Sequence, residues 1–265
     1  ILVAVVAGVA LVAAGMMWSG RVTIDLVPAA TSELLTVPAV TSVAVSSDGG
    51  EGATAATATT GMVDVSDIAA DVVDSVVTIN VTIDVRGPGD ITGSGSGIIV
   101  DGDGTIVTNA HVVDGVSTVT VTLTGEATHA AAVVGIDTIH DLAVLAIDAD
   151  GLSPITLGTT DGLEVGNPVV AVGNPFGLEG GPLVTTGIVS ALGRVLEDSD
   201  VSLHGIIQTD AAITECSSGG ALLDGEGRLI GVTTAVGVSN VGIEGIGFAI
   251  PVETVSSVVA ALLTD

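Results

Sequence analysis

Short apolar runs rich in valine, isoleucine and leucine recur along the chain from about residue 76, and turn-forming residues separate them. The run VVTINVTI at 76–83 has the β-branched composition of a strand. Further runs of this kind are SGIIVD at 96–101, GTIVTNA at 104–110, TVTVTLT at 118–124, AAAVVGID at 130–137, LAVLAID at 142–148, NPVVAVGN at 167–174, VTTGIVSAL at 184–192, GIIQTD at 205–210, RLIGVTTAV at 228–236 and GIGFAI at 245–250. Short strands at fairly even intervals, with turn sequences such as DGDG and DGEG between them, predict an all-β sandwich or barrel.

Two segments carry helical signals at the edges of this strand-rich region. Soon after Val63, the sequence VSDIAADV predicts a short capped helical turn before the first strand. At the other end, Pro251 is suited to the first turn of a helix over VETVSSVVAALLTD. We therefore expect a folded unit over residues 63–265, closed by a short C-terminal helix.

The first eighteen residues, ILVAVVAGVALVAAGMMW, contain no charged or strongly polar side chain. A helix of this length just crosses the hydrocarbon core of a bilayer, and Trp18 would then lie at the interface. The sequence predicts a transmembrane anchor over residues 1–20, and a cleaved signal peptide is the alternative. Residues 21–62 are rich in Thr, Ser, Ala and Gly without helical or alternating period, which predicts a flexible tether.

Composition narrows the partners and the stabilising chemistry. The chain has 31 acidic residues against four arginines and no lysine, a net charge of −27. Nucleic acid is therefore excluded as a partner, because phosphate binding needs clustered Lys or Arg. The acidity indicates a well-solvated surface, and adaptation to a salty medium is a further interpretation. The single cysteine, Cys216, rules out an intrachain disulfide.

Three segments carry candidate chemistry: TNAHVV around His111, HDLAVL around Asp141 and SSGGALL around Ser218. A serine hydroxyl needs a neighbouring base to become a nucleophile, and that base needs a carboxylate to hold its tautomer and stabilise its charged form. The order His, Asp, Ser along the chain is that of chymotrypsin-like proteases, whereas other triad hydrolases order the groups differently. These residues are therefore the candidate catalytic triad.

Other polar features of the sequence have simpler interpretations. His129, His140 and His204 have no metal-ligand spacing, so we expect surface or loop positions and no metal site. GSGSG at 93–97 looks like a phosphate-binding loop, but no lysine follows it. We expect this segment to form a turn before the strand that precedes His111.

The motifs TNAHVV, DLAVLAI, VGNPFGL, TDAAI, SSGGALL and GIGFAIP, taken in this order, resemble the HtrA/Deg (DegP-like) family of trypsin-like serine proteases. The resemblance covers about residues 63–265. It implies a chymotrypsin-like fold of two six-stranded β-barrels, over about 63–165 and 166–250, followed by the C-terminal helix. It also implies a cofactor-free endopeptidase of protein quality control, in a possible homotrimer. Its substrates would be unfolded or damaged proteins outside the cytoplasm, and a single-pass anchor would hold the protease domain on the periplasmic or extracellular side.

The resemblance also assigns individual residues. His111 is similar to the general base, Asp141 to its orienting carboxylate and Ser218 to the nucleophile. The backbone N–H groups of Cys216 and Ser218 would form the oxyanion hole. The substrate-binding residues would be Ala212, Ile213, Gly245 and Ile246, the first two at the floor of an apolar pocket and the last two on the strand that pairs with an extended substrate.

Cys216 departs from the family, which commonly has glycine at that position. Cysteine keeps the backbone N–H but does not adopt positive φ as freely as glycine does. Because one oxyanion donor contributes roughly a hundred- to a thousandfold to turnover, a second hypothesis is a pseudoprotease that binds extended polypeptides without cutting them. Cys216 as the nucleophile itself is a third, disfavoured reading, because it lies two residues before the position that the Gly-Gly pair defines.

Overall fold

The computed structural model describes most of the strand-rich region of the chain. The described residues are 63–84, 89–125, 127–174, 181–197, 202–214, 217–234 and 245–264. The predicted anchor, the predicted tether and Cys216 lie outside these ranges, so the domain boundaries at residues 20 and 62 stay predictions. Within the described ranges, no helix combines the length and the apolar character that crossing a bilayer requires.

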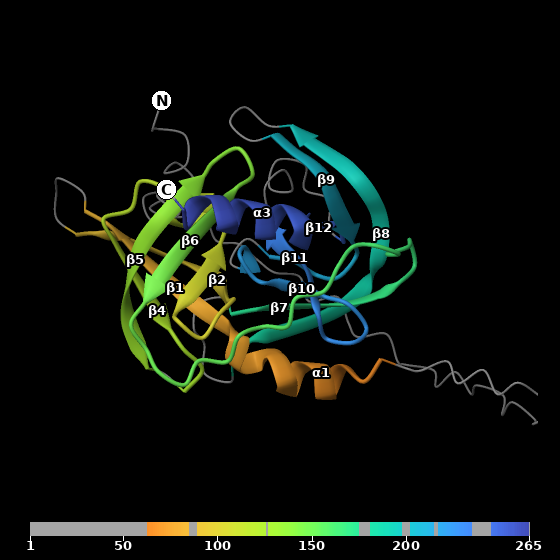
Figure 1. Cartoon of the computed structure of the whole chain (residues 1–265), viewed down its shortest axis with the longest axis horizontal. Coiled ribbons are helices and arrows are strands. Elements are labelled where there is room, and N and C mark those ends of the chain that lie inside the picture. The colour runs from red at the N-terminus through yellow and green to blue at the C-terminus, as the bar shows by residue number, and fades with distance from the viewer. Residues whose placement is uncertain are drawn as a thin grey trace, which may run out of the picture. The chain divides into compact units, whose positions relative to one another are not determined.

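The first barrel contains strands β1 to β6 and closes on itself in the order β1-β2-β3-β6-β5-β4, with every neighbouring pair antiparallel. Its strands are β1 Val76–Ile83, β2 Ile91–Ile99, β3 Thr105–Thr108, β4 Thr118–Thr122, β5 Thr128–Asp137 and β6 Leu142–Ile147. A one-turn helix, α2 (Ala110–Val113), follows β3. The short helix α1 (Val65–Val72) and a 3₁₀ turn (Val73–Ser75) precede β1 (Figure 1).

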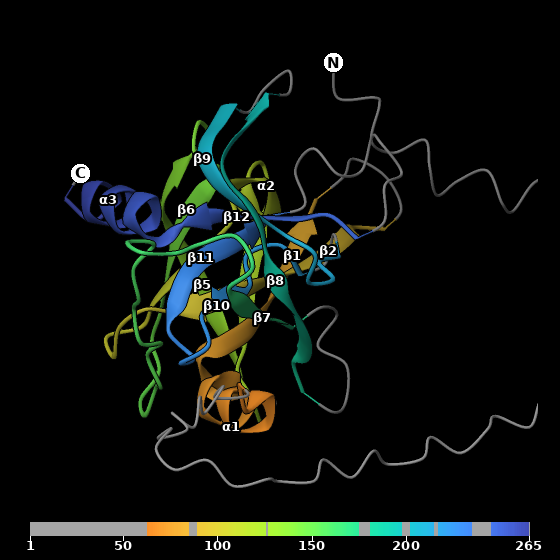
Figure 2. The same ribbon diagram turned by 90° about the vertical axis from the view of Figure 1, so that its right-hand side faces the viewer.

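The second barrel repeats this closed six-stranded architecture with the order β10-β11-β12-β9-β8-β7. Its strands are β7 Pro168–Gly173, β8 Leu183–Glu197, β9 Ser202–Thr209, β10 Ala221–Leu223, β11 Leu229–Thr234 and β12 Gly247–Pro251. The C-terminal helix α3 (Val252–Leu262) contacts β5 and β6 of the first barrel and β11 and β12 of the second. Figure 2, turned by 90°, shows α3 beside β6 and β12. The predicted double six-stranded fold with a C-terminal helix is thus confirmed.

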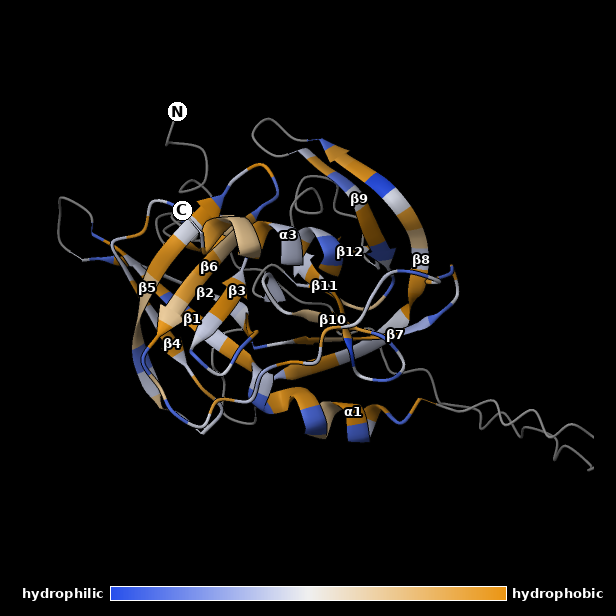
Figure 3. Cartoon of the chain, in the orientation of Figure 1, coloured by the Kyte–Doolittle hydropathy of each residue, from blue (hydrophilic) through white to orange (hydrophobic). Residues whose placement is uncertain are grey.

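Each barrel has its own aliphatic interior, and a third cluster joins the two. Val77, Ile79 and Leu145 belong to the first interior, and Val169 and Leu222 to the second. The joining cluster is the largest, and its members come from both barrels and from α1 and α3. They include Ile68, Val72, Val76, Ile98, Val107, Leu142, Val170, Val172, Leu223, Val232, Ile250, Val252, Val255 and Val258. In a strand alternate residues point to opposite faces, so one strand can contribute both to a barrel interior and to the joining cluster. Figure 3 shows hydrophobic residues along the strands of both barrels.

Two expectations need correction, and one strand was not expected. The GSGSG segment forms part of β2 rather than a turn, because its glycines let neighbouring elements pack directly on the strand: a Cβ at Gly97 would lie within 3 Å of Ile79 and Ile106 side chains. The three-residue strand β10 was not predicted, since a run so short has no period to detect. Pro251 ends β12 and precedes α3 as its N-cap residue, one position earlier than expected.

Candidate active site

The first barrel brings His111 and Asp141 into direct contact. His111 lies in α2, and Asp141 lies immediately before β6. The Nδ1 atom of His111 is 2.9 Å from Oδ1 of Asp141 and 3.0 Å from Oδ2. A proton on Nδ1 would be donated to this carboxylate and would leave Nε2 as the acceptor. The geometry is therefore the one that suits the tautomer of a general base.

The Asp141 carboxylate is almost completely buried, at 1% exposure. Its Oδ1 also accepts the backbone N–H of His111 at 3.1 Å. Its Oδ2 accepts the hydroxyl of Thr234 at 3.0 Å, from the end of β11 in the second barrel. Thr234 was not a candidate site residue in the sequence, because no local pattern signals a contact between residues 93 positions apart.

Ser218 lies in a tight turn before β10, and hydrogen bonds within this turn and to β11 fix its shape. The hydroxyl of Ser217 donates to the Thr214 carbonyl at 2.7 Å, and the N–H of Thr214 donates back to that hydroxyl at 2.8 Å. The N–H of Gly219 donates to the carbonyl of Thr233 at 2.9 Å. The last of these bonds attaches the turn to β11, and Ser218 itself is buried.

Strand β2 connects this turn with the helix that carries His111. The N–H of Ser96 donates to the carbonyl of Ser218 at 2.9 Å. A Cβ placed on neighbouring Gly95 would lie 2.8 Å from the side chain of Val112 and 3.5 Å from the carbonyl oxygen of Ser218. Val112 follows His111 in α2, so the Ser218 turn and the helix that carries the predicted base pack against the same glycine. The hydrogen bond from Thr234 of the second barrel to Asp141 of the first places the His111–Asp141 pair where the barrels meet.

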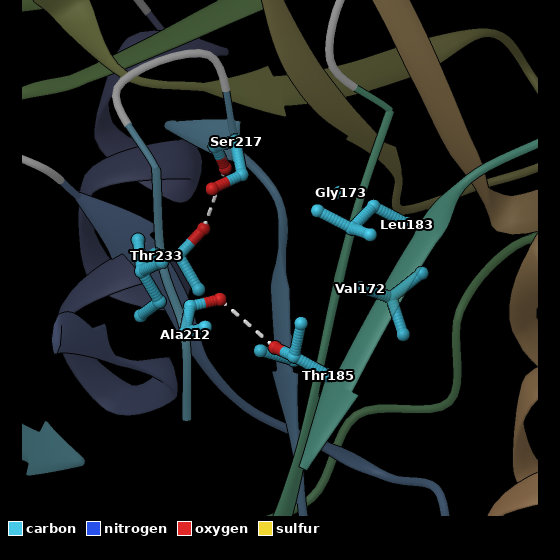
Figure 4. A pocket seen from close by; sticks show the side chains of 9 residues that line it. Val172, Gly173, Leu183, Thr185, Ala212, Ser217 and Thr233 are labelled. Atoms are coloured by element: carbon cyan, nitrogen blue, oxygen red, sulfur yellow. Dashed lines mark hydrogen bonds between the residues drawn. The ribbon is translucent and has the colours of Figure 1, made fainter. Parts of the chain in front are cut away.

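A small pocket lies beside the Ser218 turn, on the second barrel (Figure 4). Its volume of about 10 Å³ is room for about one water molecule. None of its described lining residues is charged: Ala171, Val172, Gly173, Leu183, Thr185, Ala212, Ile213, Ser217 and Thr233. The hydroxyl of Thr185 donates to the carbonyl of Ala212 at 2.9 Å and closes one side.

The predicted substrate-binding residues lie on two neighbouring segments. Ala212 and Ile213 line the small pocket. A Cβ on Gly247, the first residue of β12, would meet the Cδ1 atom of Ile213 at 2.6 Å, so the glycine allows these segments to pack closely. Gly245 and Ile246 come just before this strand, and Gly245 has a positive φ of 82° with open space around it. The Cys216 half of the predicted oxyanion hole lies outside the described residues.

The other histidines make local contacts. His140 Nδ1 lies 2.7 Å from Oδ2 of Asp137. Burial alone would raise the pKa of Asp137, but hydrogen bonds from His140 and the N–H of Ile139 lower it below its usual value. His129 contacts the carbonyl of Asp148, and His204 the hydroxyl of Ser202. Across the described residues, no group of three His, Cys, Asp or Glu side chains is placed to hold a metal ion.

Comparisons with known proteins point to a peptidase domain. Residues 95–232 match the family model described as "Trypsin-like peptidase domain". "Protease Do-like 1, chloroplastic" of Arabidopsis thaliana is 46% identical over 175 residues, which are 64% of this chain and 39% of that protein. "Probable periplasmic serine endoprotease DegP-like" of Halomonas elongata is 43% identical over 171 residues, 64% of this chain and 35% of that protein.

Solved structures give the same assignment. "HtrA-type protease AlgWS227A with decapeptide" superposes with a TM-score of 0.69 at 34% identity, covering 76% of this chain and 67% of that one. The chain spans about a third to two fifths of the length of the curated relatives that it matches. The match to the family model covers more than half of this chain, and the resemblance inferred from the ordered motifs is confirmed. The chain therefore belongs to the trypsin-like peptidase domain family, among the HtrA/DegP-like serine proteases.

Proposed function

We propose that this chain is a serine endopeptidase that cleaves unfolded or damaged polypeptides through an acyl-enzyme. The observation that carries the proposal is the contact of His111 with the buried carboxylate of Asp141, next to the turn that holds Ser218. Membership in a peptidase family supports the same reaction. The peptide-binding alternative without catalysis has no observation in its favour among the described residues or the comparisons.

The proposed mechanism gives each residue one role. Nε2 of His111 takes the proton from the Ser218 hydroxyl as its oxygen attacks the scissile carbonyl carbon, and then delivers that proton to the leaving amine. Asp141 keeps the imidazole in the required tautomer and stabilises the imidazolium. Thr234 supplies a further hydrogen bond that fixes the carboxylate. A water then repeats the sequence and releases the acyl group from Ser218.

Peptide binding is proposed along β12, with Gly245 and Ile246 offering backbone hydrogen bonds to an extended substrate. The uncharged surroundings of Ala212 and Ile213 favour a small or medium aliphatic residue before the cut. The Cys216 and Ser218 N–H groups would receive the oxyanion. Action outside the cytoplasm, attachment to a membrane through residues 1–20 and assembly as a homotrimer belong to the same proposal. The DegP-like relative of Halomonas elongata is described as periplasmic, which supports the first of these.

Incubation of the purified chain with casein tests the proposed reaction. We expect the unfolded substrate to be cleaved and the Ser218→Ala variant to leave it intact. Ser153→Ala is the matched control, since Ser153 is exposed in the segment between β6 and β7. Intact casein with the unaltered chain, or equal cleavage by the Ser218→Ala variant, contradicts the proposal.

A further inference from the structure

Asn109 occupies the N-cap position of α2, but its side chain bonds to a distant part of the chain instead of capping the helix. It is the N-cap residue of α2, and Asn is among the preferred N-cap residues because its oxygen accepts an N–H of the first turn. Its side chain makes no such hydrogen bond. Instead, the completely buried amide donates from Nδ2 to the backbone carbonyl of Asp141 at 2.9 Å.

Asp141 supplies the missing cap from a distant part of the chain. Its Oδ1 accepts the N–H of His111, the second helical residue of α2 and one of the N–H groups that an N-cap side chain serves. The two residues therefore exchange roles: the carboxylate of Asp141 caps the helix of His111, and the N-cap side chain of Asn109 holds the backbone of Asp141. This exchange links the backbone around Asp141 to the start of α2 through two hydrogen bonds.

The backbone of Asp141 explains why such a hold is required. Its φ of +53° makes it the one residue other than glycine with a positive φ in the described part of the chain. This left-handed conformation is disfavoured for a residue with a Cβ atom and persists only where the surroundings fix it. On the N-terminal side, Asp137 Oδ1 accepts the N–H groups of Ile139 and His140. On the C-terminal side, Asn109 holds the carbonyl of Asp141 itself.

The oxygen of the Asn109 amide indicates that this side chain serves to position Asp141 rather than to stabilise the fold in general. Asn109 Oδ1 is buried and has no hydrogen-bond partner among the described residues. A buried polar atom without a partner is costly, and an apolar side chain would avoid that cost. Only the Nδ2 donor justifies an asparagine here, and its acceptor is the carbonyl of Asp141.

We infer that Asn109 is a positioning residue for the proposed triad: its amide holds Asp141 in the left-handed conformation that aims the carboxylate at His111. This inference rests on the proposed function. Without the amide, Asp141 relaxes toward an ordinary φ and its carboxylate turns away from Nδ1 of His111. A misplacement of about 1 Å in a catalytic constellation lowers turnover on the order of a hundredfold.

A double-mutant cycle with peptide hydrolysis as the readout tests the inference. Asn109→Leu removes the donor at similar volume, and we expect a loss in kcat of roughly tenfold to a hundredfold with little change in KM. In an Asp141→Asn background the same substitution is expected to cost less than about twofold, because the residue it acts through is already disabled. Equal losses in the two backgrounds would overturn the inference, since a merely structural side chain acts independently of Asp141.

Two controls separate this test from failure to fold and from failure of the proposed function. Asn80→Leu, which also removes one amide donor in the first barrel (Nδ2 to the Thr122 hydroxyl, 3.2 Å), is expected to keep kcat. Asn109→Asp preserves the shape of the side chain and is expected to match Asn109→Leu. If Ser218→Ala is inactive while both Asn109 variants keep full turnover, this inference alone fails; if Ser218→Ala remains active, the proposed function fails.

Proton NMR gives a readout that does not depend on turnover. The Nδ1 proton of His111, hydrogen-bonded to a carboxylate, is expected to give a strongly downfield resonance in the unaltered chain. We expect Asn109→Leu and Asn109→Asp to broaden it beyond detection or move it upfield, while Asn80→Leu leaves it in place. An unchanged resonance in folded Asn109 variants would show that Asp141 keeps its position without the amide.

Discussion

Gly219, directly after the proposed nucleophile, shows how closely the barrels approach at the site. Its φ is +84°, and a Cβ there would overlap the carbonyl oxygen of Ser96 and the hydroxyl of Thr108. Both neighbours are buried in the first barrel, and the Thr108 hydroxyl donates to the Ser96 carbonyl at 2.7 Å. The absence of a side chain at this position is therefore a structural requirement of the Ser218 turn.

Gly219→Ala is accordingly expected to abolish peptide hydrolysis. We also expect it to lower the free energy of unfolding by roughly several kcal/mol, as severe overpacking of a core does. Denaturant unfolding and peptide turnover measure the two effects. Gly102→Ala is the matched control, because a Cβ at Gly102 meets nothing within 4 Å. A folded and active Gly219→Ala variant would disprove this description of the turn.

The surroundings of Ala212 and Ile213 carry a second prediction at the residue scale. A buried cation without a partner costs several kcal/mol, and the described lining of the neighbouring pocket contains no carboxylate. Mapping of cleavage sites in an unfolded substrate is expected to show Val, Ala, Leu or Ile before the cut. A clear preference for Arg or Lys at that subsite would refute the assignment of these residues to the substrate pocket.

At the scale of elements, β2 and the end of β7 form a polar connection between the barrels. The N–H of buried Asn174, just after β7, donates to the hydroxyl of Ser96 at 2.9 Å, and its carbonyl accepts the hydroxyl of Thr78 at 3.2 Å. Ser96→Ala leaves the Asn174 N–H without that acceptor, so we expect a loss of about 1–3 kcal/mol in the free energy of unfolding. Ser94→Ala, two residues along the same strand, is expected to change it by less than about 0.5 kcal/mol. Similar losses in the two variants would show that the connection contributes no stability.

The start of α3 is fixed by a carboxylate whose contacts depend on pH. Glu253 accepts the N–H and hydroxyl of Thr160 at 2.7 and 2.8 Å and the hydroxyl of Thr159 at 3.0 Å. Burial alone would raise the pKa of Glu253, but these hydrogen bonds lower it below its ordinary value of 4.5. A lowered pKa in the folded state stabilises the fold above the unfolded-state value, and this contribution is lost as the pH falls through the folded-state value.

Glu253→Gln is therefore expected to destabilise the chain at neutral pH by only about 0.5 kcal/mol, because Glu253 is exposed and solvent screens its contacts. The difference from the unaltered chain should shrink as the pH falls below about 4.5. Thermal unfolding across this pH range measures it, with Glu164→Gln removing one charge from an exposed position as the control. A difference that stays constant with pH would mean that the Glu253 charge does not stabilise α3.

Local elements were the part of the structure that the sequence predicted best. The runs LAVLAID and NPVVAVGN form β6 and β7. A buried strand has an alternating or continuous apolar pattern, and this pattern can be recognised in the sequence. The GSGSG segment was misread, since its glycines serve partners from other strands and from α2. The roles of Asn109 and Thr234 were not predicted for the same reason. Both donate to Asp141, which lies 32 and 93 residues away along the chain, and no local pattern encodes such a contact.

At the scale of the whole molecule, few basic residues offset the negative charge of the acidic side chains. The chain carries a net charge of −27, and Arg194 and Arg228 are the basic residues within the described part. Arg228 lies between Asp224 and Glu226, which raise its pKa, and Arg194 contacts Gln208. Like charges at this density repel each other more strongly in the compact state than in the unfolded chain.

Sodium chloride should therefore stabilise the folded chain by screening. The screening length falls from about 10 Å at 0.1 M to about 3 Å at 1 M, so we expect the unfolding temperature to rise by several degrees over this range. The chloride salt is preferred because sulfate also strengthens apolar burial by exclusion from the surface. An unfolding temperature that is flat or falls with salt would show that the acidic surface does not limit stability, and would remove the argument for adaptation to a salty medium.

Covalent labelling of the nucleophile tests the central claim most directly. A fluorophosphonate reacts only with a serine whose hydroxyl is activated by a correctly placed base, so it reports the triad without any assumption about the substrate. Peptide mapping after labelling of the purified chain is predicted to show a single adduct on Ser218, absent in Ser218→Ala and strongly reduced in His111→Ala. An unlabelled chain, or an adduct on another residue while Ser218 stays free, would contradict the assignment of His111, Asp141 and Ser218 as a working triad.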